Sequence, residues 1–93
     1  MKYFIDYLID NLNLYGFTLL KINLKKAVIF KTFNKFTKCI YINIIDNKIE
    51  VNIDRVFDLK RIYPNNIERL IISKNIFNNI EESFEYIQKN IAI

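Results

Sequence analysis

The sequence predicts a single α+β domain, residues 1–93, in which an N-terminal and a C-terminal helix pack on one face of an antiparallel sheet of hairpins with four to five strands. A chain of 93 residues has room for one hydrophobic core but not for two. Apolar residues recur at helical spacing near both ends of the chain and at a period of two between them. Helices that flank a run of hairpins are typical of the α+β class.

The first element is expected to be a helix over residues 2–15. Its apolar residues recur three and four positions apart, with Phe4 on the same arc: Ile5, Leu8, Ile9, Leu12 and Tyr15. Gly16 follows where a left-handed C-terminal cap is expected. The helix should therefore end just before Gly16.

From Phe17 the period changes to two, which predicts a first hairpin. Leu20, Ile22 and Leu24 alternate with polar residues, as in a half-buried strand. A turn is expected at Lys25-Lys26, although two lysines are not a favoured two-residue turn. Residues 27–33 would then form the returning strand.

The second hairpin is the clearest feature of the sequence. Two runs of alternating β-branched residues flank Asp46-Asn47, and both residue types tolerate the positive φ that a two-residue turn needs. This turn would place six side chains on one face: Ile40, Ile42, Ile44, Ile49, Val51 and Ile53. A slip of one residue would expose half of them, so the register should be well determined.

The segment after Asp54 is less regular. Within residues 55–66, Val56, Phe57 and Leu59 are expected either to extend the strand past a bulge or to form one helical turn, and Pro64-Asn65-Asn66 is expected to be a loop. Residues 67–73 are expected to form a short strand or the start of a helix. Asn79 followed by Glu82 is typical of a capping box, with Asn in place of Ser or Thr. It predicts a terminal amphipathic helix whose apolar face is Ile80, Phe84, Ile87 and Ile91.

The residue inventory limits the chemistry. The absence of His excludes Ser/His and Cys/His nucleophile pairs, and the single cysteine, Cys39, cannot form a structural zinc site or an internal disulfide. One glycine excludes glycine-rich phosphate loops. Asp58-Leu59-Lys60 has the D-x-K form of restriction-endonuclease-like nucleases, but Asp46, the second acid, is explained by its turn. No enzymatic activity, cofactor or metal is therefore expected.

Composition also bears on location and origin. No apolar run is long enough to cross a bilayer, and Asp6 and Asp10 interrupt the start of the chain as a signal-peptide region. A single cysteine favours a reducing compartment, so a cytoplasmic location without membrane contact is expected. The chain has 19 Ile, 13 Asn and 11 Lys but one Gly and one Pro, which is typical of an AT-rich genome.

Positive charge is concentrated in residues 11–45, which contain six lysines and no acid. With Phe36, these lysines are a candidate surface for an anionic partner: Lys21, Lys25, Lys26, Lys31, Lys35 and Lys38. The lysines could meet nucleic-acid phosphates while a phenylalanine stacks on a base. They could instead dock an acidic protein, or simply protect an edge strand from aggregation.

The predicted first helix offers a second candidate surface. Tyr3, Tyr7 and Leu14 would lie together on a flank outside its core arc. Tyrosine is enriched in interface hot spots, so this flank predicts a protein interface, with a homodimer as its simplest form. The alternative is that a loop, such as residues 55–66, covers the flank.

These features predict a small intracellular, non-catalytic protein-binding module. Small size and AT-rich coding suggest a phage- or mobile-element-encoded inhibitor that acts on a host protein inside the host cell. The alternative is a small nucleic-acid-binding regulator that uses the Lys/Phe-rich hairpin.

Overall fold

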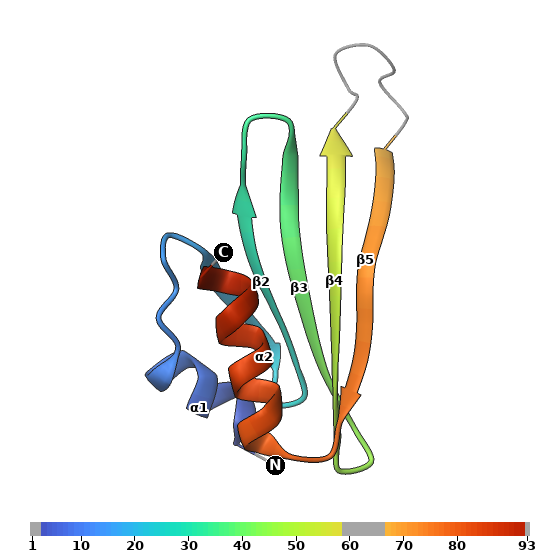
Figure 1. The fold of residues 1–93 in the computed structure, drawn as a ribbon. Coiled ribbons are helices and arrows are strands. Elements are labelled where there is room, and N and C mark those ends of the chain that lie inside the picture. Colours follow the sequence, from blue (N-terminus) through green and yellow to red (C-terminus); the bar gives the residue numbers. More distant parts are fainter. Residues whose placement is uncertain (1–2, 59–66, 93) are drawn as a thin grey trace.

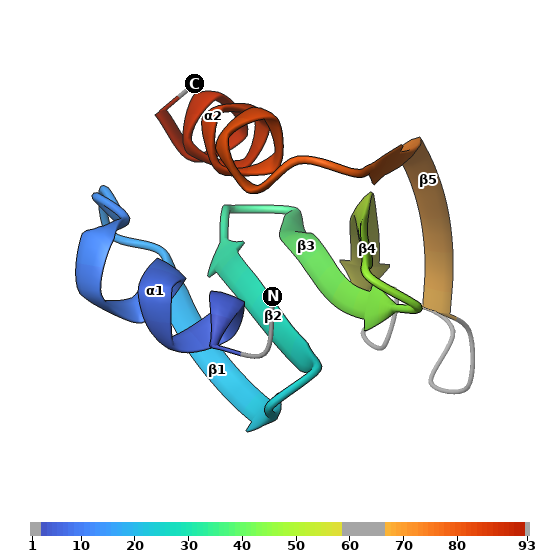
Figure 2. The ribbon, with the colours of Figure 1, turned by 90° about the horizontal axis from the view of Figure 1, so that it is seen from below.

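The computed structural model describes residues 3–58 and 67–92. The elements in chain order are α1 (Phe4–Asn11), β1 (Thr18–Asn23), β2 (Lys26–Thr32), β3 (Phe36–Ile45), β4 (Lys48–Asp58), β5 (Ile67–Phe77) and α2 (Ile80–Ala92). The five strands form one antiparallel sheet in which each strand lies beside its neighbours in the chain (Figure 1). Both helices pack on the sheet (Figure 2), so the predicted α+β fold is confirmed.

The core lies between the two helices and one face of the sheet. Phe4, Ile5 and Leu8 of α1 and Ile87 and Ile91 of α2 belong to the same buried cluster as the strand residues. The strands contribute the side chains that point to this face: Ala27, Ile29, Ile40, Ile42, Ile49, Val51 and Ile53. All of them are at most 2% exposed. Neither of the two helices in the described part of the chain lies on the opposite face of the sheet, which we call the open face.

The second hairpin has the predicted register. Ile44 pairs with Ile49, Ile42 pairs with Val51, and Ile40 pairs with Ile53. The turn is Asp46-Asn47, and both residues adopt positive φ, 48° and 63°. This backbone twist matches the twist of the flanking strands, which is why Asp and Asn are suited to the two positions.

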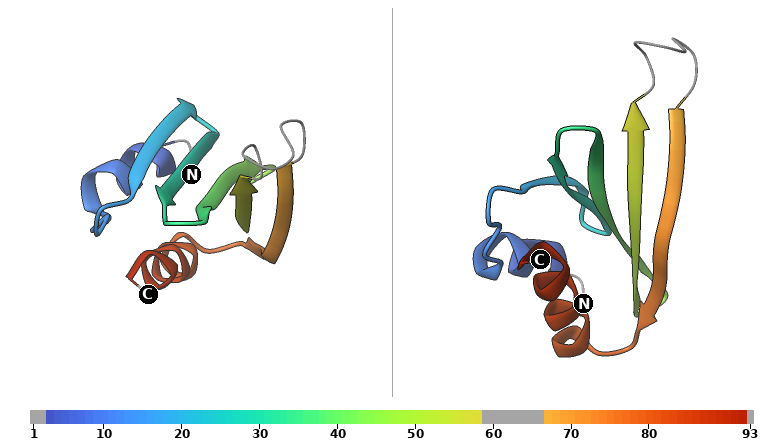
Figure 3. Two further views of the ribbon diagram at one scale, coloured as in Figure 1. Left: turned by 90° about the horizontal axis from the view of Figure 1, so that it is seen from above. Right: turned by 45° about the horizontal axis from the view of Figure 1, so that its top comes forward.

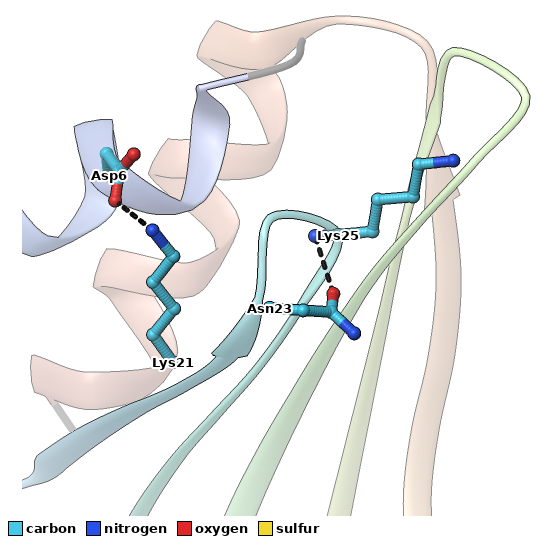
Figure 4. A network of polar contacts seen from close by, with 4 residues as sticks. All are labelled: Asp6, Lys21, Asn23 and Lys25. Carbon is cyan, nitrogen blue, oxygen red and sulfur yellow. Dashed lines mark hydrogen bonds and ion pairs between the residues drawn. The ribbon is translucent and has the colours of Figure 1, made fainter.

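The first hairpin departs from the prediction at its turn. The turn residues are Leu24 and Lys25, not Lys25 and Lys26, because β2 begins at Lys26. A bulge lies between Lys21 and Asn23, so one strand has an extra residue before the turn. The Lys25 amide donates a hydrogen bond of 2.8 Å to Asn23 Oδ1, which stabilises this shifted turn (Figure 4).

The apolar residues predicted to alternate in the first hairpin do not reach the core. Leu19 pairs with the buried Ile29 and so faces the helices. Leu20 and Ile22 therefore point to the open face, where they are 54% and 60% exposed, and Leu24 in the turn is 42% exposed. The predicted alternation is present, but its apolar residues lie on the open face.

The first helix is shorter than the predicted span of residues 2–15. It ends at Asn11, because Leu12 is extended with φ −71° and ψ 138°. The Asn13 backbone instead makes two 2.8 Å hydrogen bonds with the Gln88 side chain, one from its amide and one to its carbonyl. These bonds to α2 offer the backbone an alternative to the helix, and Gly16, at φ 88°, then leads the chain into β1.

The described residues just after Asp54 continue β4. Of the two alternatives predicted for residues 55–66, strand extension holds through Asp58, and residues 59–66 lie outside the described part of the chain. β5 runs to Phe77, longer than the short strand predicted for residues 67–73, and pairs with β4 along its length with one bulge. The distal ends of β4 and β5 extend past both helices (Figure 3).

The terminal helix begins as the sequence predicts. Asn79 Oδ1 accepts hydrogen bonds from the amides of Glu81 and Glu82, at 2.7 and 3.3 Å, and so caps α2. Ile87 and Ile91 are buried, and Phe84 packs against the core. Neither α1 nor α2, the two helices of the described residues, is long and apolar enough to cross a membrane.

Candidate binding surfaces

The six lysines predicted to form one surface for an anionic partner lie on both sides of the sheet. Three lie on the side that the helices cover: Lys21, Lys31 and Lys38. Lys26 lies on the open face, and Lys25 and Lys35 lie in turns. Side chains alternate between the two faces along a strand, so the structure does not bring the six lysines together on one face. Binding of an anionic partner by these residues stays a prediction.

Lys21 is paired with an acid of the first helix. Its Nζ lies 2.7 Å from Asp6 Oδ1, and the two side chains are 35% and 42% exposed. Figure 4 shows this ion pair connecting α1 to β1. An exposed pair of this kind contributes little to the free energy of folding, but it orients Lys21 toward the helix rather than toward a partner.

Lys38 caps the C-terminal end of α2. Its Nζ donates a hydrogen bond of 2.7 Å to the carbonyl oxygen of Asn90, in the last turn of the helix. A cation stabilises this end of a helix, because the unpaired carbonyls carry partial negative charge. Burial lowers the pKa of Lys38, and the charge of Arg55, its cross-strand neighbour on β4, lowers it further. This lysine therefore has a structural partner within the chain.

Lys31 and Arg55 lie against a stack of phenylalanine rings. The Phe33 and Phe36 rings are stacked, with centroids 5.0 Å apart and an interplanar angle of 22°. Lys31 Nζ lies 5.5 Å from the Phe33 centroid and 5.8 Å from that of Phe17, and Arg55 Cζ lies 4.8 Å from the Phe36 centroid. Cations at these distances are attracted to the rings. Phe36, predicted to contact an anionic partner, is thus packed between a ring and a guanidinium.

Replacing Arg55 with methionine is expected to raise the pKa of Lys38 toward its ordinary value, because one of the two causes of its lowering is removed. The rise should be partial, since burial, the larger cause, remains. Methionine keeps an apolar cover on Phe36. A pH titration of Lys38 Nζ by NMR measures the change.

The same substitution should alter stability at alkaline pH. A lysine with a lowered pKa binds its proton less tightly in the folded chain than in the unfolded chain. The contribution of Lys38 to the free energy of unfolding therefore rises as the pH increases from the pKa of Lys38 in the folded chain to its pKa in the unfolded chain. This rise should be smaller in the Arg55→Met variant. Lys48→Met, at the other end of the sheet, is the control. An unchanged Lys38 pKa in the Arg55→Met variant would contradict the assigned cause.

The predicted interface of Tyr3, Tyr7 and Leu14 does not form one helix flank. Tyr3 and Tyr7 are 63% and 45% exposed, but Leu14 lies beyond the end of α1 and packs against the core. The Tyr7 ring also contacts Phe84 of α2 edge-on, with centroids 5.5 Å apart. A homodimer or other interface through Tyr3 and Tyr7 stays a prediction.

The cysteine and the two acids singled out in the sequence, Cys39, Asp46 and Asp58, lie in different parts of the sheet. Cys39 is a buried residue of β3, opposite Asp54 of β4, and these two are 8% and 4% exposed. Asp46 is a turn residue. Asp58 is the last residue of β4. Leu59 and Lys60, the other two residues of the nuclease-like motif, lie outside the described residues, so the prediction for this motif is not tested.

The open face and its adjoining turn carry five large aliphatic side chains that the sequence did not single out as a surface. They are Leu20, Ile22, Leu24, Ile45 and Ile76, and their exposed fractions range from 42% to 60%. No known protein family, curated protein or solved structure matches this chain.

The apolar residues converge at one end of the open face, beside the turns Leu24-Lys25 and Asp46-Asn47. Two shallow depressions of about 240 and 530 Å³ share Ile45 as a wall. The smaller is also lined by Asp46, Lys48, Glu50 and Ile76. The larger is also lined by Asn23, Leu24, Lys25, Lys26, Asn43 and Ile44. We call this region the tip surface, defined by Leu24, Lys25, Lys26, Ile45, Lys48 and Ile76.

Proposed function

We propose that the protein is a small non-catalytic protein-binding module that docks its partner on the open face of the sheet. The supporting observation is the exposure of the five aliphatic side chains on this face and in its adjoining turn, with Ile22 at 60%. Single exposed apolar residues are common on protein surfaces, but a group of them on one face is typical of an interaction site.

The exposed apolar side chains of this face can supply binding energy. Exposed apolar area that is removed from water contributes about 25 cal/mol per Å², so docking here would stabilise a complex. The opposite face already buries its apolar residues under α1 and α2. Exposed lysines also flank the apolar residues and can select a partner by charge: Lys25, Lys26, Lys48 and Lys74.

The nucleic-acid-binding alternative has less support. Three of its six lysines have partners within the chain: Lys21 contacts Asp6, Lys31 lies over two rings, and Lys38 caps α2. A phage or mobile-element origin and an inhibitory role have composition as their only support and stay predictions. A steep loss of binding with added salt would favour the nucleic-acid alternative.

A photo-reactive amino acid at position 20 or position 9 tests the proposed function in the cells that make the protein. Leu20 lies on the open face and Ile9 lies on α1, and they are 54% and 47% exposed. A cross-linked protein from position 20, but not from position 9, is expected and can be identified by mass spectrometry.

The identified partner is then purified and titrated against two variants. Leu20→Lys should weaken its binding by about tenfold or more, whereas Ile9→Lys should have little effect. Thermal melts establish that both variants are folded. Cross-links from position 9 alone, or equal effects of the two variants, would remove the open face as the binding surface.

A further inference from the structure

We infer that the tip surface binds an acidic protein segment that carries large apolar side chains. This inference rests on the proposed function and specifies its partner. The apolar side chains of the segment would enter the depressions beside Ile45, and its carboxylates would meet Lys25, Lys26 and Lys48.

A backbone hydrogen bond and a tight turn fix the backbone beneath the tip surface. The Ile44 amide donates a hydrogen bond of 2.8 Å to the Lys25 carbonyl, which joins the β1–β2 turn to the second hairpin. The Asp46-Asn47 turn, with both residues at positive φ, determines where β3 ends and so where Ile45 lies. Figure 4 shows the Lys25 side chain extending away from Asn23. A surface joined in this way across two hairpins loses little freedom on binding.

The depressions fit side chains rather than a small-molecule ligand. Both are shallow, and Leu24, Ile45 and Ile76 on their rims are 42%, 46% and 59% exposed. Pockets that take the apolar side chains of a peptide are a recurring source of specificity in peptide recognition. Because Ile45 separates the depressions, two apolar residues of one segment can occupy them together.

Charge determines which segment fits. Lys25, Lys26 and Lys48 are exposed, and none of them forms an ion pair with another described residue. Two acids, Asp46 and Glu50, line the smaller depression, and Glu50 keeps its charge while it accepts a 2.8 Å hydrogen bond from the neutral Asn52 side chain. The three lysines outnumber these two acids by one. The tip surface thus carries an excess of positive charge, which attracts carboxylates.

The same observations disfavour two other occupants. A second copy of this chain would bring the same excess of positive charge to the interface, and like charges across an interface oppose association. A nucleic acid would place phosphates beside the exposed aliphatic side chains of Leu24, Ile45 and Ile76, where burying charge without a partner is unfavourable. An acidic, partly apolar protein segment satisfies both the lysines and the aliphatic residues.

The experiment uses random peptides displayed on phage particles, selected on the wild-type protein. Enriched peptides are expected to combine Asp or Glu with Leu, Ile or Phe. Their affinity should be about tenfold or more lower for the Ile45→Glu variant and for the Lys48→Glu variant. The matched controls are Ile9→Glu, since Ile9 is 47% exposed against 46% for Ile45, and Lys89→Glu on α2. Amide shifts of a bound peptide should map to the tip surface.

Each other result has a separate meaning. Peptides that lose binding to Ile45→Glu but carry no acids would overturn the inferred partner chemistry and leave the open face as the binding surface. Peptides that bind all variants equally and map to the helix side would overturn both the inference and the proposed function. Failure to enrich any peptide would overturn the inference, because the depressions would then hold no peptide segment.

Discussion

Replacing Ile42 with alanine is expected to lower the free energy of unfolding by about 2–5 kcal/mol, because it removes buried methyl groups and leaves a cavity. Ile42 is 1% exposed and lies between Ala27 and Val51 in the centre of the sheet. Small domains have a total stability of about 5–15 kcal/mol, so this change alone is a large fraction of it. Urea unfolding followed by circular dichroism measures the loss.

The matched control is Ile22→Ala in the same sheet. Ile22 is 60% exposed on the open face, and its truncation should change stability by about 0.5 kcal/mol or less. The two variants remove the same atoms, so the difference between them reports burial alone. Equal urea midpoints would contradict the described placement of the two residues.

Replacing Phe4 with alanine is expected to lower stability by about 3–5 kcal/mol, since a buried aromatic ring is lost from the junction of α1 and the sheet. Phe4 is 2% exposed and belongs to the central cluster. Tyr3→Ala is the control, because its ring is 63% exposed one position earlier. Thermal unfolding compares the two, and a larger loss from the tyrosine change would place α1 in a different orientation.

The second hairpin could be predicted because its signals are local and agree with one another. The alternating β-branched residues on both sides of Asp46-Asn47 allow one register that buries them together. The cap at Asn79 is local in the same sense, because its hydrogen bonds join residues two and three positions apart. Such features depend little on the rest of the fold.

The face of the first strand could not be predicted in this way. Both alternating sets contain apolar residues, Leu19 in one and Leu20 and Ile22 in the other. The pairing of Leu19 with Ile29 and the contact of Lys21 with Asp6 decide between them. Those contacts depend on where α1 packs, which is information outside the strand itself.

The end of the first helix and the role of Lys38 depend on still more distant contacts. Asn13 and Gln88 are 75 positions apart, and Lys38 and Asn90 are 52 positions apart. A local apolar period cannot show that a side chain of α2 will pair with the backbone after Asn11. Counting lysines in the sequence likewise overestimated the candidate basic surface, because it ignored which side of the sheet each one occupies.

The strand order of the sheet has a consequence for how the chain folds. Each strand pairs only with its neighbours in sequence, so the sheet can form by adding one hairpin at a time. Such connections keep paired strands closer in sequence than crossover connections would, so less loop entropy is lost before their contacts form. The long-range steps are the docking of the two helices and the Asn13–Gln88 contact that links the two ends of the chain. We expect the β3–β4 hairpin to form early and the contact between Asn13 and Gln88 to form last.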